Sequence, residues 1–358
     1  MMGGMVVQQR KAVVLGAGGL VSQRLQQRLA NHPWFELAAV AGSPRFYGQN
    51  LSSVPWILDE ERPAMVDHTV VDVTDTTVMK GLADEGVCVA FSALPTEEAE
   101  RLEPLWAAHG MTVFSNASAH RRKDGVPLVI PELNPEDLND AAVDDKLGLV
   151  CATNCTLLPL IFPLAAMNAA FGLEQFAMRS EQGLSGGGHP FMMQALKEGS
   201  VAPDIPGEAE KTDAEFRHIL RWTGTSDVVC SRVMRKDGHH VFVEATLAQE
   251  VSPQSVEAAI KEWASMYHYP LLPSSPYRPI MVVDAIDPQA HLFGNGDAFE
   301  ASPNPAEDLK AGMAVVVGNI RCSGPNTVHF EAYSHNTLRG AAGGVVFLAE
   351  MACAMNLV

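Results

Sequence analysis

A glycine-rich turn near the N-terminus constrains the fold of this chain more than any other feature. Residues 11–15 (KAVVL) indicate a short buried strand, and residues 16–19 (GAGG) follow it directly. Apolar side chains then recur at helical spacing over residues 20–29, and a second apolar run occupies residues 35–41. A strand, a glycine turn, a helix and a second strand in this order predict the start of a parallel sheet.

The same alternation continues to about residue 153, after which the pattern changes. Further short apolar runs, separated by helical patterns such as residues 96–108, lie at 69–73, 87–94, 112–115 and 148–152. A helical pattern at 156–170 then precedes longer strand candidates at 175–182, 228–235, 240–247, 279–286 and 314–321. We therefore expect an α/β protein with a Rossmann-like first domain and an α+β second domain with a mixed sheet.

The apolar tail, residues 338–357, has helical spacing and is expected to pack on the first domain. This expectation assigns residues 1–153 and 335–358 to the first domain and residues 154–334 to the second.

Composition and charge exclude several classes of protein. The 358 residues carry 25 Lys and Arg against 42 Asp and Glu, a net charge of −17 that disfavours nucleic-acid binding. Six scattered cysteines without a CxxC pattern favour a reducing, cytoplasmic compartment. The start of the chain has no signal-peptide pattern, and the most apolar run, residues 157–167, is too short to span a membrane.

The glycine turn and the end of the second strand predict the cofactor. Gly16, Gly18 and Gly19 precede a helix N-terminus, where free N–H groups and the helix dipole favour a pyrophosphate. An NAD site places an acid at the end of the second strand, but this chain has Ser43 and Arg45 there. A hydroxyl and a guanidinium suit a 2′-phosphate, so NADP is favoured over NAD. The alternative is an ordinary polar turn.

Cys155 is the candidate nucleophile, because it lies where a strand leads into a helix. A thiol in the first turn of a helix has its pKa lowered by the dipole. His239 follows a predicted tight turn at Asp237-Gly238 and is the candidate base. No metal is expected, since no further ligand lies at suitable spacing from His239 and His240.

A competing motif occurs at residues 183–187, which match the G-x-S-x-G nucleophile elbow of α/β-hydrolases. Extra glycines after Ser185 weaken the required helix, and a hydrolase leaves the N-terminal glycine turn unexplained.

Many short motifs, in order and spacing, resemble aspartate-semialdehyde dehydrogenases, most closely the archaeal and fungal branch. They are HPWFEL at 32–37, FSALP at 91–95, SNA at 115–117 with Arg121, VPLVIPE at 126–132, NCT at 154–156, QGLSG at 182–186, Arg232 seven residues before His239, SHNT at 334–337 and RGAA at 339–342. Together they span the chain from residue 15 to its C-terminal region.

The resemblance implies NADPH-dependent reduction of L-aspartyl 4-phosphate to aspartate 4-semialdehyde and phosphate, a step of amino-acid biosynthesis. In this family Cys155 matches the nucleophile that forms a thioester, His239 the acid/base, and Gln182 the residue that positions the acyl group. Arg232 matches the arginine that binds the substrate carboxylate.

Further roles follow from the same resemblance. Glu208 matches a residue that binds the substrate amine, Lys211 a lysine near the phosphate, and Arg121 and Asn116 the phosphate site. The implied NADP-binding set is Gly16, Gly18, Gly19, Leu20, Val21, Ser43, Arg45, Ser92, Ala93, Ser185, Gly186 and Asn336. The family also implies a catalytic and dimerisation role for the second domain, in a homodimer or homotetramer.

Departures from the family motifs leave the substrate open. The usual SGAGYP is SGGGHP here, with His189, and the usual RVPVxDGH is RVMRKDGH, with Met234 and Arg235. The usual GATGxVG is GAGGLVS. The alternative within the superfamily is a malonyl-CoA reductase, and the alternative from another class is an NADPH-binding regulator without turnover.

Overall fold

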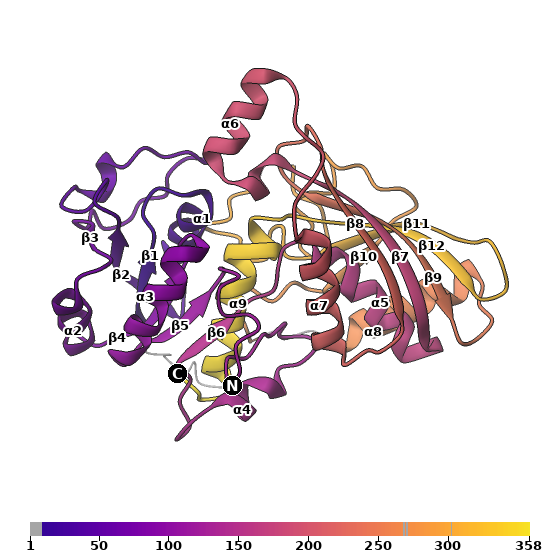
Figure 1. Cartoon of the computed structure of the whole chain (residues 1–358), viewed down its shortest axis with the longest axis horizontal. Coiled ribbons are helices and arrows are strands. Elements are labelled where there is room, and N and C mark those ends of the chain that lie inside the picture. The colour runs from indigo at the N-terminus through magenta and orange to yellow at the C-terminus, as the bar shows by residue number, and fades with distance from the viewer. Residues whose placement is uncertain (1–8, 268, 270, 302) are drawn as a thin grey trace, which may run out of the picture.

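The computed structural model describes residues 9–267, 269, 271–301 and 303–358, which build two six-stranded sheets with helices packed against them (Figure 1). The first part of the chain forms one sheet, which the C-terminal helix also covers, and the rest of the chain forms the other sheet.

The first sheet is parallel, with the strand order β3-β2-β1-β4-β5-β6. Its strands are β1 (Arg10–Leu15), β2 (Phe35–Gly42), β3 (Val71–Asp72), β4 (Val87–Ser92), β5 (Thr112–Ser115) and β6 (Leu149–Cys151). Its helices are α1 (Leu20–Leu29), α2 (Thr76–Asp84), α3 (Thr96–Ala108), α4 (Glu136–Ala141) and α9 (Gly343–Ala354), with a 3₁₀ turn η1 (Leu51–Ser53). The order reverses between β1 and β4, and open parallel sheets bind ligands at this point, beyond the carboxyl ends of the strands.

The second sheet is mixed, as predicted, with the strand order β10-β11-β12-β9-β7-β8. Its strands are β7 (Leu173–Gln182), β8 (Thr225–Arg232), β9 (His239–Leu247), β10 (Ile280–Val282), β11 (Val315–Cys322) and β12 (Thr327–Ser334). The other elements of this part are α5 (Leu157–Phe171), η2 (Leu184–Gly187), α6 (His189–Glu198), α7 (Glu208–Leu220) and α8 (Pro253–Met266). The π-helix η3 (Leu338–Ala342) lies mainly against α1 and α9 of the first part.

Helix α5 lies at the centre of the second core. Its prolines do not prevent helix formation, and residues 157–167 are buried against the mixed sheet and against α7 and α8. A helix that is apolar on every side belongs in a protein core or a membrane. No helix in the described part of the chain has the length and apolarity needed to cross a bilayer.

Several expected boundaries differ from the structure. Strand β3 has two residues and β10 three, where the sequence predicted 69–73 and 279–286. Both are edge strands with one neighbour each, so little holds the chain in extended form for longer. Helices α2, α4 and α8 were not predicted.

The C-terminal tail packs on the first core, as expected, because α9 lies against α1 and β5. The two cores do not divide the chain cleanly. Leu128 and Ile130 pack in the second core, and Leu272 and Met313 pack in the first. The proposed domain limits therefore stay a prediction.

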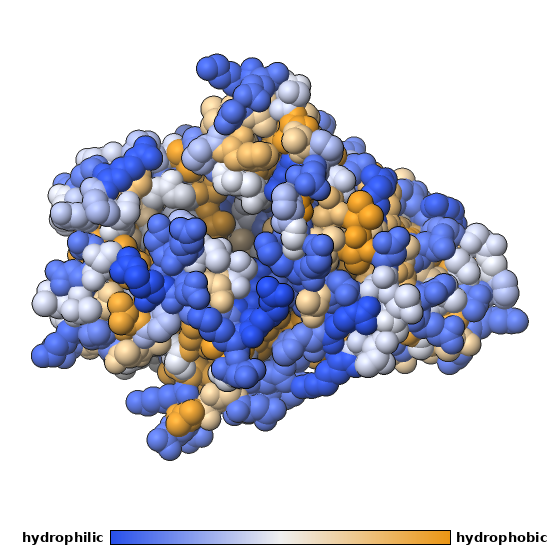
Figure 2. Space-filling model, in the orientation of Figure 1, coloured by the Kyte–Doolittle hydropathy of each residue, from blue (hydrophilic) through white to orange (hydrophobic). Residues whose placement is uncertain are grey.

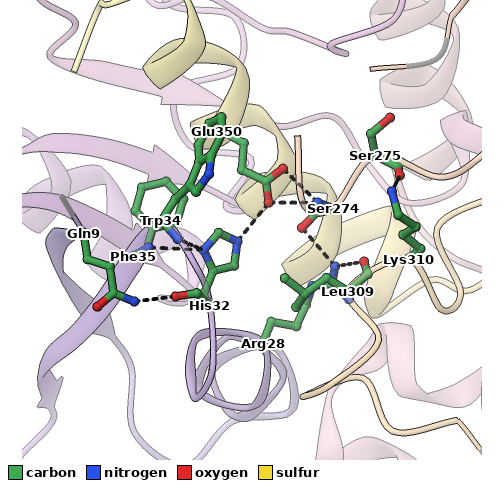
Figure 3. Close-up of polar contacts among 10 residues, drawn as sticks. All are labelled: Gln9, Arg28, His32, Trp34, Phe35, Ser274, Ser275, Leu309, Lys310 and Glu350. Atoms are coloured by element: carbon green, nitrogen blue, oxygen red, sulfur yellow. Dashed lines mark hydrogen bonds and ion pairs between the residues drawn. The ribbon is translucent and has the colours of Figure 1, made fainter. Parts of the chain in front are cut away.

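A buried polar cluster connects α1 and α9 with a loop from the second part of the chain (Figure 3). His32 Nε2 lies 2.9 Å from the Glu350 carboxylate, and both side chains are fully buried. His32 Nδ1 accepts hydrogen bonds from the backbone N–H groups of Trp34 and Phe35, so the imidazole proton resides on Nε2. Glu350 also accepts the N–H of Ser274.

Arg28 extends this cluster from the buried face of α1. Its Nη2 donates to Ser274 Oγ at 3.1 Å and to the carbonyl of Leu309 (Figure 3). Burial lowers the pKa of Arg28 to about 10, although the negative charge of Glu350 raises it. These contacts fix α1, whose N-terminus begins at the glycine turn.

Candidate active site

A thiol and an imidazole meet between the two sheets. Cys155 Sγ lies 3.1 Å from His239 Nε2. The Oδ1 of Asn154 accepts the N–H of Leu157, the first residue of α5, and this holds Cys155 just before the helix. His239 begins β9 after Gly238, which has a φ of +87° and lies against the Tyr333 ring, so the predicted tight turn is present.

The expected electrostatics of Cys155 were wrong. The sequence placed this thiol in the first helical turn with a lowered pKa, but α5 begins at Leu157. Burial raises the pKa of Cys155 to about 12, and the nearby Glu208 carboxylate adds to this. Burial also lowers the pKa of His239 to about 3. Desolvation outweighs the helix dipole here, so the resting pair is a thiol beside a neutral imidazole.

Strand pairing brings three predicted residues to one edge of the mixed sheet. Gln182, the last residue of β7, is the register partner of Arg232 in β8 and of His239 in β9. The Arg232 Nη1 donates to the carbonyl of Gly183 at 2.8 Å. A Cβ on Gly186 would lie 2.8 Å from Arg232 Nη1 and 3.2 Å from His239 Cε1, so a larger residue there would displace the Arg232 side chain.

Cys155 opens into a cavity of about 320 Å³ that contains ten of the predicted site residues. They are Val21, Ala93, Asn116, Arg121, Cys155, Ser185, Gly186, Glu208, Lys211 and Asn336. Gln182, Arg232 and His239 are not part of its lining.

Two cationic side chains line this cavity, and they differ in their contacts. Arg121 is tied down, with Nη1 3.0 Å from Glu215 Oε1 and Nη2 donating to the carbonyl of Asn116. Lys211 has no side-chain hydrogen bond or ion pair with any other described residue. Its ammonium group is therefore available to an anion. Glu208 accepts a hydrogen bond from Thr156 Oγ1 at 3.1 Å.

The predicted cofactor residues lie around the switch point of the first sheet. Gly16 has a φ of +117°, which a side chain would strain, and Gly19 precedes α1 with its N–H bonded to Ser22 Oγ. A Cβ on Gly18 would lie 2.7 Å from the Phe46 ring. Ser92 is fully buried at the end of β4.

Other predicted cofactor residues have further contacts. Ser43 and Arg45 are exposed after β2, and the Arg45 guanidinium lies 5.0 Å from the centre of the Phe46 ring. Leu20 packs on Leu184 in a small apolar cluster. Asn336 Oδ1 accepts the Gly238 N–H at 2.7 Å, while its Nδ2 donates to Ser185 Oγ, so it also holds the turn before His239.

The hydrolase reading of residues 183–187 receives no support from these contacts. Ser185 lies in the 3₁₀ turn η2 and accepts a hydrogen bond from Asn336, whereas His239 contacts the thiol of Cys155.

Three residues near the site were missed by the sequence analysis. The Glu215 carboxylate accepts hydrogen bonds from Arg121 Nη1 at 3.0 Å and from the backbone N–H of Asn154 at 2.6 Å. Its position two helical turns after Glu208 was a signal in the sequence that both side chains lie on one helix face. Gly340, in the π-helix, lies against Cys155, since a Cβ there would be 2.6 Å from Cys155 Cβ. Phe46 packs on the glycine turn, a contact without a local sequence signal.

Comparison with known proteins identifies the family. A family model described as the semialdehyde dehydrogenase NAD-binding domain matches residues 11–141. The aspartate-semialdehyde dehydrogenase of Archaeoglobus fulgidus is 34% identical over 94% of this chain and 96% of its own length. The chain belongs to the aspartate-semialdehyde dehydrogenase family. The resemblance stated from the motifs is thereby confirmed.

Two further relatives bear on fold and substrate. A crystal structure of the Candida albicans aspartate-semialdehyde dehydrogenase with NADP superposes with a TM-score of 0.76 at 27% identity, covering 98% of this chain and all of that one. This similarity confirms the predicted fold class. The malonyl-CoA reductase (NADP) of Metallosphaera sedula is 29% identical over 95% of this chain and 96% of its own length.

Proposed function

We propose that this chain catalyses the NADPH-dependent reductive dephosphorylation of L-aspartyl 4-phosphate to L-aspartate 4-semialdehyde. The observation that carries the proposal is the contact between Cys155 and His239 beside a cavity that Cys155, Lys211 and Arg121 line. A nucleophile with its base beside two cations suits an acyl phosphate, whose leaving group is an anion.

The residues that surround the glycine turn fit NADP. Gly16 adopts a positive φ, α1 offers free backbone N–H groups, and Ser43 with Arg45 stands where NAD enzymes carry an acid. When bound, NADPH supplies the hydride that reduces the acyl group.

Cys155 and His239 carry out the covalent steps. The Sγ attacks the acyl carbon while its proton passes to His239 Nε2, and phosphate leaves, so that a thioester forms. To accept this proton at Nε2, the neutral imidazole must carry its own proton on Nδ1, where a hydrogen bond with the backbone of Gly238 favours the protonated ring. The Gly183 N–H, 3.2 Å from Nδ1, then keeps its bond to the Gly238 carbonyl. After reduction the thiohemiacetal collapses, the aldehyde leaves, and His239 returns the proton to sulfur.

The remaining site residues bind the substrate. Arg232 binds the α-carboxylate, since a guanidinium offers paired donors, and Glu208 binds the ammonium group. Lys211 and Arg121, with Asn116, bind the phosphate group. Gln182, buried at the end of β7, positions the acyl group.

The substrate roles separate this proposal from malonyl-CoA reduction. Malonyl-CoA has a carboxylate but no amine, so Glu208 matters only for the aspartyl substrate. We expect Glu208→Gln to raise the KM for aspartate semialdehyde roughly tenfold, the effect of one lost charge-assisted hydrogen bond. Arg232→Lys should cost more, because lysine cannot form the bidentate contact. If Glu208→Gln leaves this KM unchanged and malonyl-CoA is the faster substrate, the thioester reductase is the correct assignment.

The cellular setting follows from the same proposal. The enzyme serves amino-acid biosynthesis in the cytoplasm, leading to lysine, threonine and methionine. It acts as a homodimer or homotetramer through the second domain, and binds neither nucleic acid nor membranes. The face of the mixed sheet turned away from α5 carries Phe242 and Val229 among charged residues, which suits self-association.

A further inference from the structure

Helix α6 brings an aromatic side chain to the edge of the active site. The helix projects beside the gap between the two sheets (Figure 1), and Figure 2 shows apolar residues on its visible side beneath a hydrophilic tip. Met192 and Ala195 are buried against Leu20 and Leu184, which fixes the helix on the core. Phe191 is the third residue of this helix and is 40% exposed.

The Phe191 ring occupies the space next to Gly187. A Cβ on Gly187 would overlap Cδ1 of the ring and would lie 2.9 Å from its Cγ. Only glycine at position 187 leaves room for the ring. The family motif quoted above has alanine at this position, so the departure to glycine and the placement of Phe191 are sterically linked.

The same ring covers the guanidinium of Arg232. The Cζ of Arg232 lies 5.6 Å from the centre of the ring, within the range of a cation–π contact. The Arg232 side chain donates to the Gly183 carbonyl and forms no ion pair with a carboxylate in the described part of the chain. Burial lowers the pKa of Arg232, in keeping with the loss of water around the group.

We infer that Phe191 is a specificity-determining residue, which packs on Gly187 and holds Arg232 for a substrate that carries a carboxylate. This inference rests on the proposed function, because it assumes that Arg232 binds the substrate carboxylate. The aromatic face restricts the guanidinium and displaces water from it, and both effects strengthen its attraction for an anion. Phosphate, which binds near Lys211 and Arg121, is outside its influence.

Steady-state kinetics on five variants test the inference. Phe191→Ala should raise the KM for aspartate semialdehyde about three- to tenfold, with the KM for phosphate and kcat little changed. Phe191→Tyr keeps the ring and should behave as the wild type. Gly187→Ala should displace the ring, give the same rise, and add nothing to Phe191→Ala in the double variant. Leu196→Ala, which alters another exposed apolar residue of α6, should leave the kinetics unchanged.

A chemical probe keeps the result separate from the proposed function. Phenylglyoxal should modify Arg232 several-fold faster in Phe191→Ala than in the wild type, Phe191→Tyr or Leu196→Ala, as followed by peptide mass spectrometry. Faster modification in an enzyme that does not turn over aspartate semialdehyde overturns the proposed function but supports the role of Phe191. Unchanged modification and unchanged KM in Phe191→Ala overturn the inference.

Discussion

The buried carboxylate of Glu215 offers a test of how the phosphate site is built. Glu215 is 4% exposed, and its carboxylate accepts hydrogen bonds from Arg121 at 3.0 Å and from the Asn154 N–H at 2.6 Å. It therefore positions both Arg121, a cation of the site, and Asn154, the residue before the nucleophile. In Glu215→Gln one of these donors faces an amide NH₂ group instead of an acceptor. The lost charge-assisted bond costs about 1.5–3 kcal/mol. Glu215→Ala leaves Arg121 without its partner and should cost about 3–5 kcal/mol.

Urea denaturation and phosphate kinetics measure the two consequences. The Glu215→Gln variant should unfold at lower urea and show a KM for phosphate raised about tenfold, because Arg121 is no longer held. Glu136→Gln is the matched control, since Glu136 pairs with Arg221 at 3.4 Å on the surface, where such pairs contribute little. If Glu215→Gln matches the wild type in both stability and phosphate KM, the reasoning about this carboxylate is refuted.

Three further predictions concern the thiol, the cofactor and a glycine. Because burial raises the pKa of Cys155 to about 12, its alkylation by iodoacetamide should rise about tenfold per pH unit between pH 8 and 11; a plateau near pH 7 contradicts this. Arg45→Glu should weaken NADPH binding about tenfold or more and NADH binding little, as measured by fluorescence titration, and equal losses contradict the role of Arg45. Gly340→Ala should displace Cys155 and lower kcat at least about tenfold while NADPH still binds; unchanged kcat refutes the packing argument.

Local patterns in the sequence were sufficient for much of the fold. The strand, glycine turn and helix at residues 11–29 predicted the start of a parallel sheet, and the long strands after residue 154 predicted a mixed one. Both predictions depend on the period of the apolar residues and on the turn residues, and both features can be read within a short segment of the sequence. The edge strands β3 and β10 were predicted to be longer than they are, because their length depends on pairing with β2 and β11.

The site was predictable in its members but not in its electrostatics. Motif order placed Cys155 and His239 together, and the structure puts them in contact. The pKa of Cys155 could not be read from its position before a helix, because burial, a property of the assembled fold, dominates it. The contacts of Glu215 with Asn154 and of Phe191 with Arg232 join segments far apart in the sequence. Helical spacing from Glu208 was a local signal for Glu215, whereas the contact of Phe191 with Arg232 had none.

The central claim is that Cys155 forms a thioester from an aspartyl acyl group. The most direct measurement mixes wild-type enzyme with aspartate semialdehyde, phosphate and NADP⁺ and follows the absorbance of NADPH, with Cys155→Ser in parallel and malonyl-CoA plus NADPH as the competing assay. The account predicts sustained NADPH formation by the wild type, loss of turnover by orders of magnitude in Cys155→Ser with NADPH binding retained, and slower oxidation of NADPH with malonyl-CoA. Full activity in Cys155→Ser, or faster turnover of malonyl-CoA than of the semialdehyde, would contradict it.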